Sequence, residues 1–222
     1  MFCIKTYEAL LKCTIQRLDK LNPIYTLSGG IDSSLIFSYL DNPECFCAQA
    51  NGNDDYAYAK RLYPNVIKIE FNDVDIEEIL TKVQSLYDEP YCNMSDMYDY
   101  FVYTRFPDRI IIVGEEPRFV GGINIAKYTR RLFFKFWPMV DSPYIYYENL
   151  YKKEYIKELV RRRLPRFISE RKKRNYDGPN PVWRKEHEAQ IEYLKLKYDV
   201  NETDFVKMWE KLNFSIWEKL NK

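Results

Sequence analysis

The stretch that decides the fold is Ser28-Gly29-Gly30-Ile31-Asp32-Ser33-Ser34, which follows the apolar segment 24–27 and opens a helical pattern over residues 33–40. A strand, a glycine-rich loop and a helix in this order form an anion site. The glycines let a phosphate approach the backbone, and the amides at the helix start point toward negative charge. The serine hydroxyls add donors, and Asp32 can hold a magnesium ion that bridges phosphate oxygens. The loop is not a Walker A loop, because the Gly-Lys-Ser/Thr ending is missing. A plain Gly-Gly turn with a Ser/Asp helix cap is the alternative.

Alternating helices and strands are predicted on both sides of this loop. Before it we expect a helix over 7–21 and a strand over 24–27. After it we expect strands over 45–50, 66–71 and 110–113, and helices over 55–62, 76–86 and 94–105. Strands that alternate with helices predict an α/β fold, with a parallel sheet covered by helices on both faces. Cys45 and Cys47, on a buried strand, are interpreted as core residues.

The second half of the chain changes to segments rich in Lys, Arg, Glu and Tyr. Here we expect helices over 151–162, 185–198 and 204–220, the last capped by Asn201, and no strand. His187 is expected to be an exposed helical residue. We therefore predict an α/β core over residues 1–125, and a helical C-terminal part over residues 126–222 that completes the active site.

The composition excludes several classes of protein. Among 222 residues, 34 Lys and Arg balance 33 Asp and Glu, so no global basic field favours nucleic acid or an anionic membrane. No apolar run is long enough to span a bilayer, and no signal peptide is visible. Five cysteines in an unpatterned set indicate reduced thiols, and we expect a cytoplasmic protein. The single histidine argues against a histidine metal site or a Ser-His-Asp triad.

The loop resembles the pyrophosphate loop (PP-loop) of the N-type ATP pyrophosphatases. It is most similar to the synthetase domain of asparagine synthetase and β-lactam synthetase, which has the adenine nucleotide alpha hydrolase-like fold. Further similar segments come in the family's order: Asp54-x-x-Ala57-x-Ala59, Asp88-Glu89-Pro90 with Ser95, Pro138-Met139-Val140-Asp141, and Leu164-Pro165 followed by Arg171-Lys172-Lys173-Arg174-Asn175-Tyr176, Pro179 and Trp183. The resemblance implies an ATP-dependent carbon–nitrogen ligase that adenylates a carboxylate, releases pyrophosphate and transfers the acyl group to ammonia or an amine. It implies ATP and Mg²⁺ as cofactors.

The resemblance also implies site residues. The positions that would bind ATP and its pyrophosphate are Leu27, Ser28, Gly29, Gly30, Asp32, Ser33, Ser34, Ala50 and Gly114. Lys173 would stabilise the negative charge as the acyl-adenylate is made and consumed, and Glu115 would assist catalysis at the end of a strand. Asp32 and Glu116 would bind the metal, since the chain lacks the family's Asp-Glu pair after Gly114. The alternative for the basic run 161–174 is a solvated helix face.

The absence of a glutaminase nucleophile decides which nitrogen donors we expect. In the family, glutamine-using members carry a glutaminase domain whose nucleophile is a cysteine directly after the initiator Met, but Phe2 stands here. Nitrogen would then come from ammonia, an amine or a separate glutaminase or nitrogen-donor subunit. One alternative is an ATP pyrophosphatase that modifies a nucleobase in tRNA or DNA, which the basic clusters leave open. Another is a non-catalytic nucleotide-binding protein, suggested by the missing Asp-Glu pair.

Overall fold

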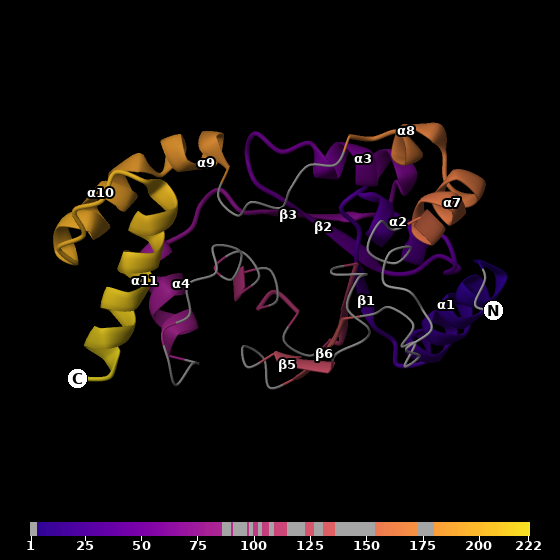
Figure 1. Ribbon diagram of the computed structural model, residues 1–222, viewed down its shortest axis with the longest axis horizontal. Coiled ribbons are helices and arrows are strands. Elements are labelled where there is room, and N and C mark those ends of the chain that lie inside the picture. Colours follow the sequence, from indigo (N-terminus) through magenta and orange to yellow (C-terminus); the bar gives the residue numbers. More distant parts are fainter. Residues whose placement is uncertain are drawn as a thin grey trace.

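The computed structural model describes residues 4–85, 90, 97, 100–101, 104–106, 109–114, 123–126, 131–135, 154–172 and 180–222 (Figure 1). Within these residues the protein is built around a central sheet with the strand order β3-β2-β1-β4-β6-β5. The strands are β1 (Ile24–Thr26), β2 (Cys45–Gln49), β3 (Ile67–Glu70), β4 (Ile111–Val113), β5 (Ile123–Ala126) and β6 (Arg131–Lys135). The neighbouring strands β3, β2, β1, β4 and β6 all run parallel to one another, whereas β5 runs antiparallel to β6. The predicted α/β fold with a parallel sheet is confirmed.

The helices surround this sheet. In the first half they are α1 (Ile4–Asp19), α2 (Ile31–Phe37), α3 (Asp55–Leu62) and α4 (Ile76–Gln84). In the second half they are α7 (Glu154–Arg163), α8 (Arg166–Ser169), α9 (Pro181–Glu186), α10 (Glu188–Lys197) and α11 (Phe205–Leu220). The predicted helix over 94–105 lies largely outside the described residues. Within the described ranges, every helix falls short of the length and apolar character that a membrane crossing requires.

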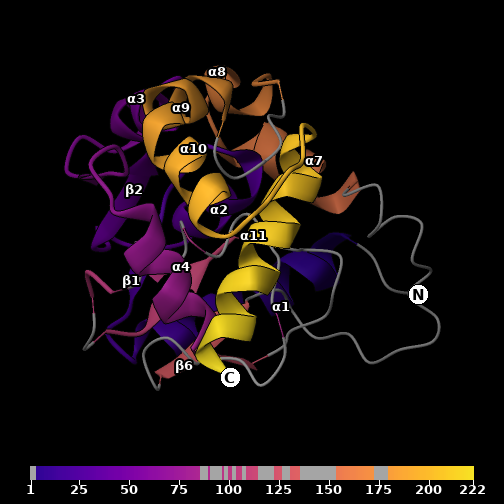
Figure 2. The ribbon, with the colours of Figure 1, turned by 90° about the vertical axis from the view of Figure 1, so that its left-hand side faces the viewer.

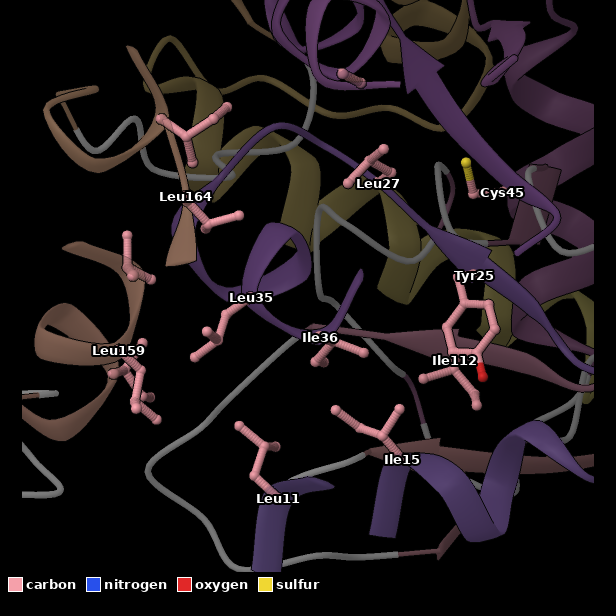
Figure 3. Close-up of a cluster of buried hydrophobic side chains, with 14 of the residues drawn as sticks. Leu11, Ile15, Tyr25, Leu27, Leu35, Ile36, Cys45, Ile112, Leu159 and Leu164 are labelled. Atoms are coloured by element: carbon pink, nitrogen blue, oxygen red, sulfur yellow. The ribbon is translucent and has the colours of Figure 1, made fainter. Parts of the chain in front are cut away.

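Alternation along the central strands gives the sheet two apolar faces. On one face Tyr25, Cys45 and Ile112 join a buried cluster with α1, α2, α7 and α8 (Figure 3). On the other face Phe46 and Ile111 join a smaller cluster against which Phe101 and Phe106 pack. Successive strand residues point to opposite faces, so a strand buried on both faces reads as a continuous apolar run.

A second large cluster joins α4 to the C-terminal helices. Its fully buried centre includes Trp183, Trp209 and Leu212, which pack with Phe71 from the end of β3. Figures 1 and 2 both show α11 alongside α4, and α9 and α10 complete this end of the molecule. Both large clusters therefore contain residues from each half of the chain. The predicted boundary near residue 125 divides the sequence but not the core.

The expectation of no strand in the second half is wrong. The strand β6 pairs in parallel with β4, with Ile112 opposite Phe134, and β5 adds an antiparallel edge. The apolar run of β6 is only three residues long, Leu132–Phe134, between two basic residues. Such a run has no periodicity of its own, and its pairing with a distant strand makes it part of the sheet.

Two further local predictions are corrected. Asp204, not Asn201, caps α11: its carboxylate accepts a hydrogen bond from the Lys207 amide at 3.0 Å. His187 is buried, with only 5% of its surface exposed, and is not the exposed residue that the sequence predicts. Its ring stacks on Trp183 at 3.9 Å between centroids, and its Nδ1 lies 2.9 Å from the Trp183 carbonyl oxygen one turn earlier. The junction between α9 and α10 places this histidine inside the second cluster.

The two cysteines of β2 are core residues, as predicted. Both thiols are buried and free. Burial, aided by the nearby charge of Glu44, raises the pKa of the Cys45 thiol to about 12. Burial also raises the pKa of Cys47, with Asp55 contributing in the same direction.

Candidate functional site

The glycine-rich loop lies at the carboxyl end of β1, in the middle of the parallel part of the sheet. Its backbone turns at Gly29, which has a φ of +67° that L side chains rarely adopt. A Cβ at Gly29 would lie 2.5 Å from the Tyr58 Cβ and 3.0 Å from the Ala59 nitrogen. The glycine is therefore required both by its conformation and by its contact with α3.

Hydrogen bonds within the loop hold its shape. The Ser28 amide donates to the Ser33 Oγ at 3.2 Å, and the two serine hydroxyls lie 3.1 Å apart. The Gly30 amide donates to the Ser28 Oγ at 3.3 Å, and the Ser33 Oγ donates to the Gly30 carbonyl at 3.4 Å. These bonds restrict the loop's conformations, and a loop that is restricted in this way loses less freedom when a ligand binds.

The end of β4 packs directly on the start of α2. A Cβ at Gly114 would lie 2.7 Å from the Ser33 nitrogen and 2.8 Å from its Cα. Any side chain at this position would push β4 away from the loop. The predicted site residues Gly114 and Ser33 are thus brought together, from segments about 80 residues apart.

Asp32 and Ser34 follow in the first turn of α2. The N-cap of this helix is Gly30, which has no side chain to cap the first turn. Asp32 is partly buried, and its negative charge acts on the hydroxyl of Tyr7 in α1. Burial, together with the Asp32 carboxylate, raises the pKa of the Tyr7 hydroxyl above its ordinary value. Ser34 is completely buried, so its side chain does not reach the surface of the loop.

Leu27 directly follows the end of β1, and Ala50 directly follows the end of β2. Leu27 is fully buried in the first cluster, and Ala50 is buried in the second, together with Trp183. The Gln49 side chain donates to the carbonyls of Ala50, at 2.9 Å, and Asn53, and accepts a hydrogen bond from the Tyr56 amide at 3.0 Å. These bonds set the path of the loop that leads into α3.

Arg171 is a site residue that the sequence did not single out. Its guanidinium donates to the Ser28 carbonyl at 2.9 Å, and to carboxylate oxygens of Asp54 at 2.7 Å and Asp55 at 2.5 Å. It lies 4.1 Å from the centre of the Tyr58 ring, and its side chain is only 8% exposed. The only signal in the sequence was that Asp54 and Arg171 each lie in a segment that resembles the family.

The charge environment keeps this guanidinium ionised. Burial lowers the pKa of Arg171, but hydrogen bonds and charge from Asp55 and Asp54 outweigh it and raise the pKa above its ordinary value. The earlier arginines differ, because Arg161 and Arg162 are exposed and pair with Glu158 on their own helix. The solvated-face interpretation therefore applies to these two residues and not to Arg171.

A second set of contacts joins the two halves of the chain through the residues that follow position 179. The Asn180 side chain caps α9 and donates to the Asn51 carbonyl at 2.8 Å. A Cβ at Gly52, which has a φ of +79°, would lie 2.7 Å from Val182. Trp183 donates its ring N–H to the Phe71 carbonyl at 2.8 Å. The chain is thus fixed at the sheet edge both before residue 173 and after residue 179.

Three predicted residues, Lys173, Glu115 and Glu116, lie outside the described residues, as do residues 136–150 with their aromatic run. Among the residues that are described, no three His, Cys, Asp or Glu side chains gather as a metal site would need. Asp32 alone supplies a carboxylate within the loop. The magnesium ligands therefore remain a prediction.

The family that matches this chain agrees with the motif. Residues 6–114 match the family model for asparagine synthase. No curated protein sequence matches the chain. One solved structure that does match is NMN synthetase from Francisella tularensis. It aligns with 100% of this chain and 95% of its own, at 15% identity and a TM-score of 0.48.

Proposed function

We propose that this chain, whose residues 6–114 match the family model for asparagine synthase, binds ATP at the Ser28–Ser34 loop and cleaves it between the α and β phosphates. The observation that carries the proposal is the loop itself. It is a glycine turn, held by internal hydrogen bonds, at the carboxyl end of a central parallel strand, where ligands of α/β sheets bind. Its lack of a Walker lysine argues against release of the γ-phosphate.

The loop offers donors that suit a polyphosphate. Gly29 lets the backbone approach the ligand without a Cβ, and the hydroxyls of Ser28 and Ser33 lie on the same turn. A magnesium ion held by Asp32 and Glu116 would neutralise charge on the phosphate oxygens. The chain's own contribution is to hold these groups in place through the hydrogen bonds within the loop.

The reaction that we propose is amide formation. A carboxylate oxygen attacks the α-phosphorus, pyrophosphate leaves, and ammonia or an amine then displaces AMP from the acyl-adenylate. Lys173 would stabilise the negative charge in both steps, and Glu115, directly after Gly114, would lie at the ligand-binding edge of the sheet. The nitrogen donor would be ammonia, an amine or a partner subunit.

Paired lysine variants test the role of the C-terminal half. Lys173→Ala should lower the rate of ATP–pyrophosphate exchange by about 100-fold or more, comparable to losing one preorganised donor. The neighbouring Lys172, which is exposed, supplies the matched control, and Lys172→Ala should leave the rate nearly unchanged. Equal rates close to that of the unmodified protein for both variants would show that Lys173 has no such role.

A further inference from the structure

We propose that Arg171 is a positioning residue that sets the orientation of the Ser28–Gly29 peptide for the phosphates of ATP. This inference rests on the proposed function, since it requires that ATP binds at the loop. Arg171 would act through the loop backbone rather than by touching the substrate.

Arg171 contacts the Ser28–Gly29 peptide unit at its carbonyl oxygen. In a planar trans peptide, the Ser28 carbonyl and the Gly29 N–H point in opposite directions. Arg171 holds this carbonyl at 2.9 Å from its guanidinium nitrogen. The Gly29 N–H is therefore directed away from Arg171. Because glycine tolerates both signs of φ, little in the residue itself keeps the peptide in this orientation.

The guanidinium is itself held in place from three sides. Asp54 and Asp55, at the start of α3, bind one nitrogen, and the Tyr58 ring lies against the guanidinium. Asp55 is fixed in turn, because its second oxygen accepts a hydrogen bond from Asn53 at 3.0 Å. The planar fork of arginine makes these bonds together with the one to Ser28, whereas a lysine ammonium has no such fixed geometry.

The chain contains a matched contact that lacks this role. Arg163 of α7 donates to the Ser38 carbonyl at 2.8 Å and to its hydroxyl at 3.1 Å, and lies 3.8 Å from the centre of the Tyr39 ring. It thus ties the C-terminal half to the opposite end of α2, away from the glycine turn. Loss of either arginine removes a cross-link between the halves, but only Arg171 contacts the loop.

The test is calorimetric titration of ATP and of pyrophosphate, with Mg²⁺, into the full chain and its Arg171→Met, Arg171→Lys and Arg163→Met variants. Arg171→Met should weaken both ligands by about 10- to 100-fold, the range for a charge-assisted hydrogen bond. Arg171→Lys should weaken them by several-fold, and Arg163→Met by less than twofold. Unfolding in urea, measured in parallel, shows how much stability each cross-link contributes.

The outcomes separate the two proposals. If the unmodified protein binds neither ligand, the proposed function fails. If it binds both, and Arg171→Met binds them as tightly as Arg163→Met does, the positioning role is overturned, even where stability has dropped. If Arg171→Met does not fold, Arg171→Lys decides, because affinity equal to that of the unmodified protein overturns the role.

Discussion

Replacing Gly29 by alanine should destabilise the protein far more than the same change one residue later. Gly29 has a φ of +67°, whereas Gly30 has an ordinary φ of −74°. The new Cβ at Gly29 would meet the Cβ of Tyr58 at 2.5 Å. At Gly30 the nearest atom is the Ser28 hydroxyl oxygen at 3.2 Å, which can rotate.

The magnitude follows from two contributions. A left-handed conformation costs an L side chain about 1–2 kcal/mol. Overpacking against α3 adds about 1–3 kcal/mol, because the clashing atoms belong to the backbone or adjoin it. Gly29→Ala should therefore lower the free energy of unfolding by about 2–5 kcal/mol. Gly30→Ala should change it by less than about 1 kcal/mol, since neither contribution applies in full.

The assay is urea unfolding followed by circular dichroism, with both variants measured beside the unmodified protein. Equal m-values would show that the difference lies in stability rather than in the extent of the transition. If Gly29→Ala is as stable as Gly30→Ala, the left-handed turn and its contact with α3 are not features of the folded protein.

Three other predictions concern the rest of the described structure. Gly114→Ala should lower the free energy of unfolding by about 1–3 kcal/mol in urea and weaken ATP binding, because its Cβ would displace the start of α2. Burial raises the pKa of Glu77, but hydrogen bonds from α10 outweigh this and lower it. The stabilisation from Glu77, at most about 1 kcal/mol, is therefore present at pH 7. It is lost as the pH falls below the ordinary glutamate pKa of 4.5 and through the lowered pKa of Glu77 in the folded protein, so the stability gap to Glu77→Gln should close there. Iodoacetamide should modify the exposed Cys13 in the native protein, but Cys45 and Cys47 only after unfolding, as peptide mass mapping would show.

The architecture of the first half could be predicted because its signals are local. Strands β1 to β4 and helices α1 to α4 follow the predicted segments within a few residues. Apolar runs that alternate with amphipathic helices predict a parallel sheet, and the glycine turn marks the loop between β1 and α2. The two glycines mark this loop in the sequence because glycine adopts a positive φ as readily as a negative one, but the sequence does not say that Gly29 rather than Gly30 has the positive φ.

The features that were missed depend on contacts between distant residues. The strand β6 is defined by pairing with β4, and His187 is buried because the turn after α9 stacks it on Trp183. Arg171 looked like one member of a basic run, and only the fold brings it to Asp54 and Ser28, more than 110 residues away. No local pattern carries such information, because charge runs read the same whether solvated or buried.

Cleavage of ATP between the α and β phosphates at the Ser28–Ser34 loop is the proposed activity on which the other proposals depend. Its most direct test is product analysis after incubating the full chain with ATP, Mg²⁺, ammonia and a panel of carboxylic acids. We predict AMP and pyrophosphate in equal amounts, with Asp32→Ala removing most of the activity while the circular dichroism spectrum is unchanged. Release of ADP and phosphate instead would contradict the claim.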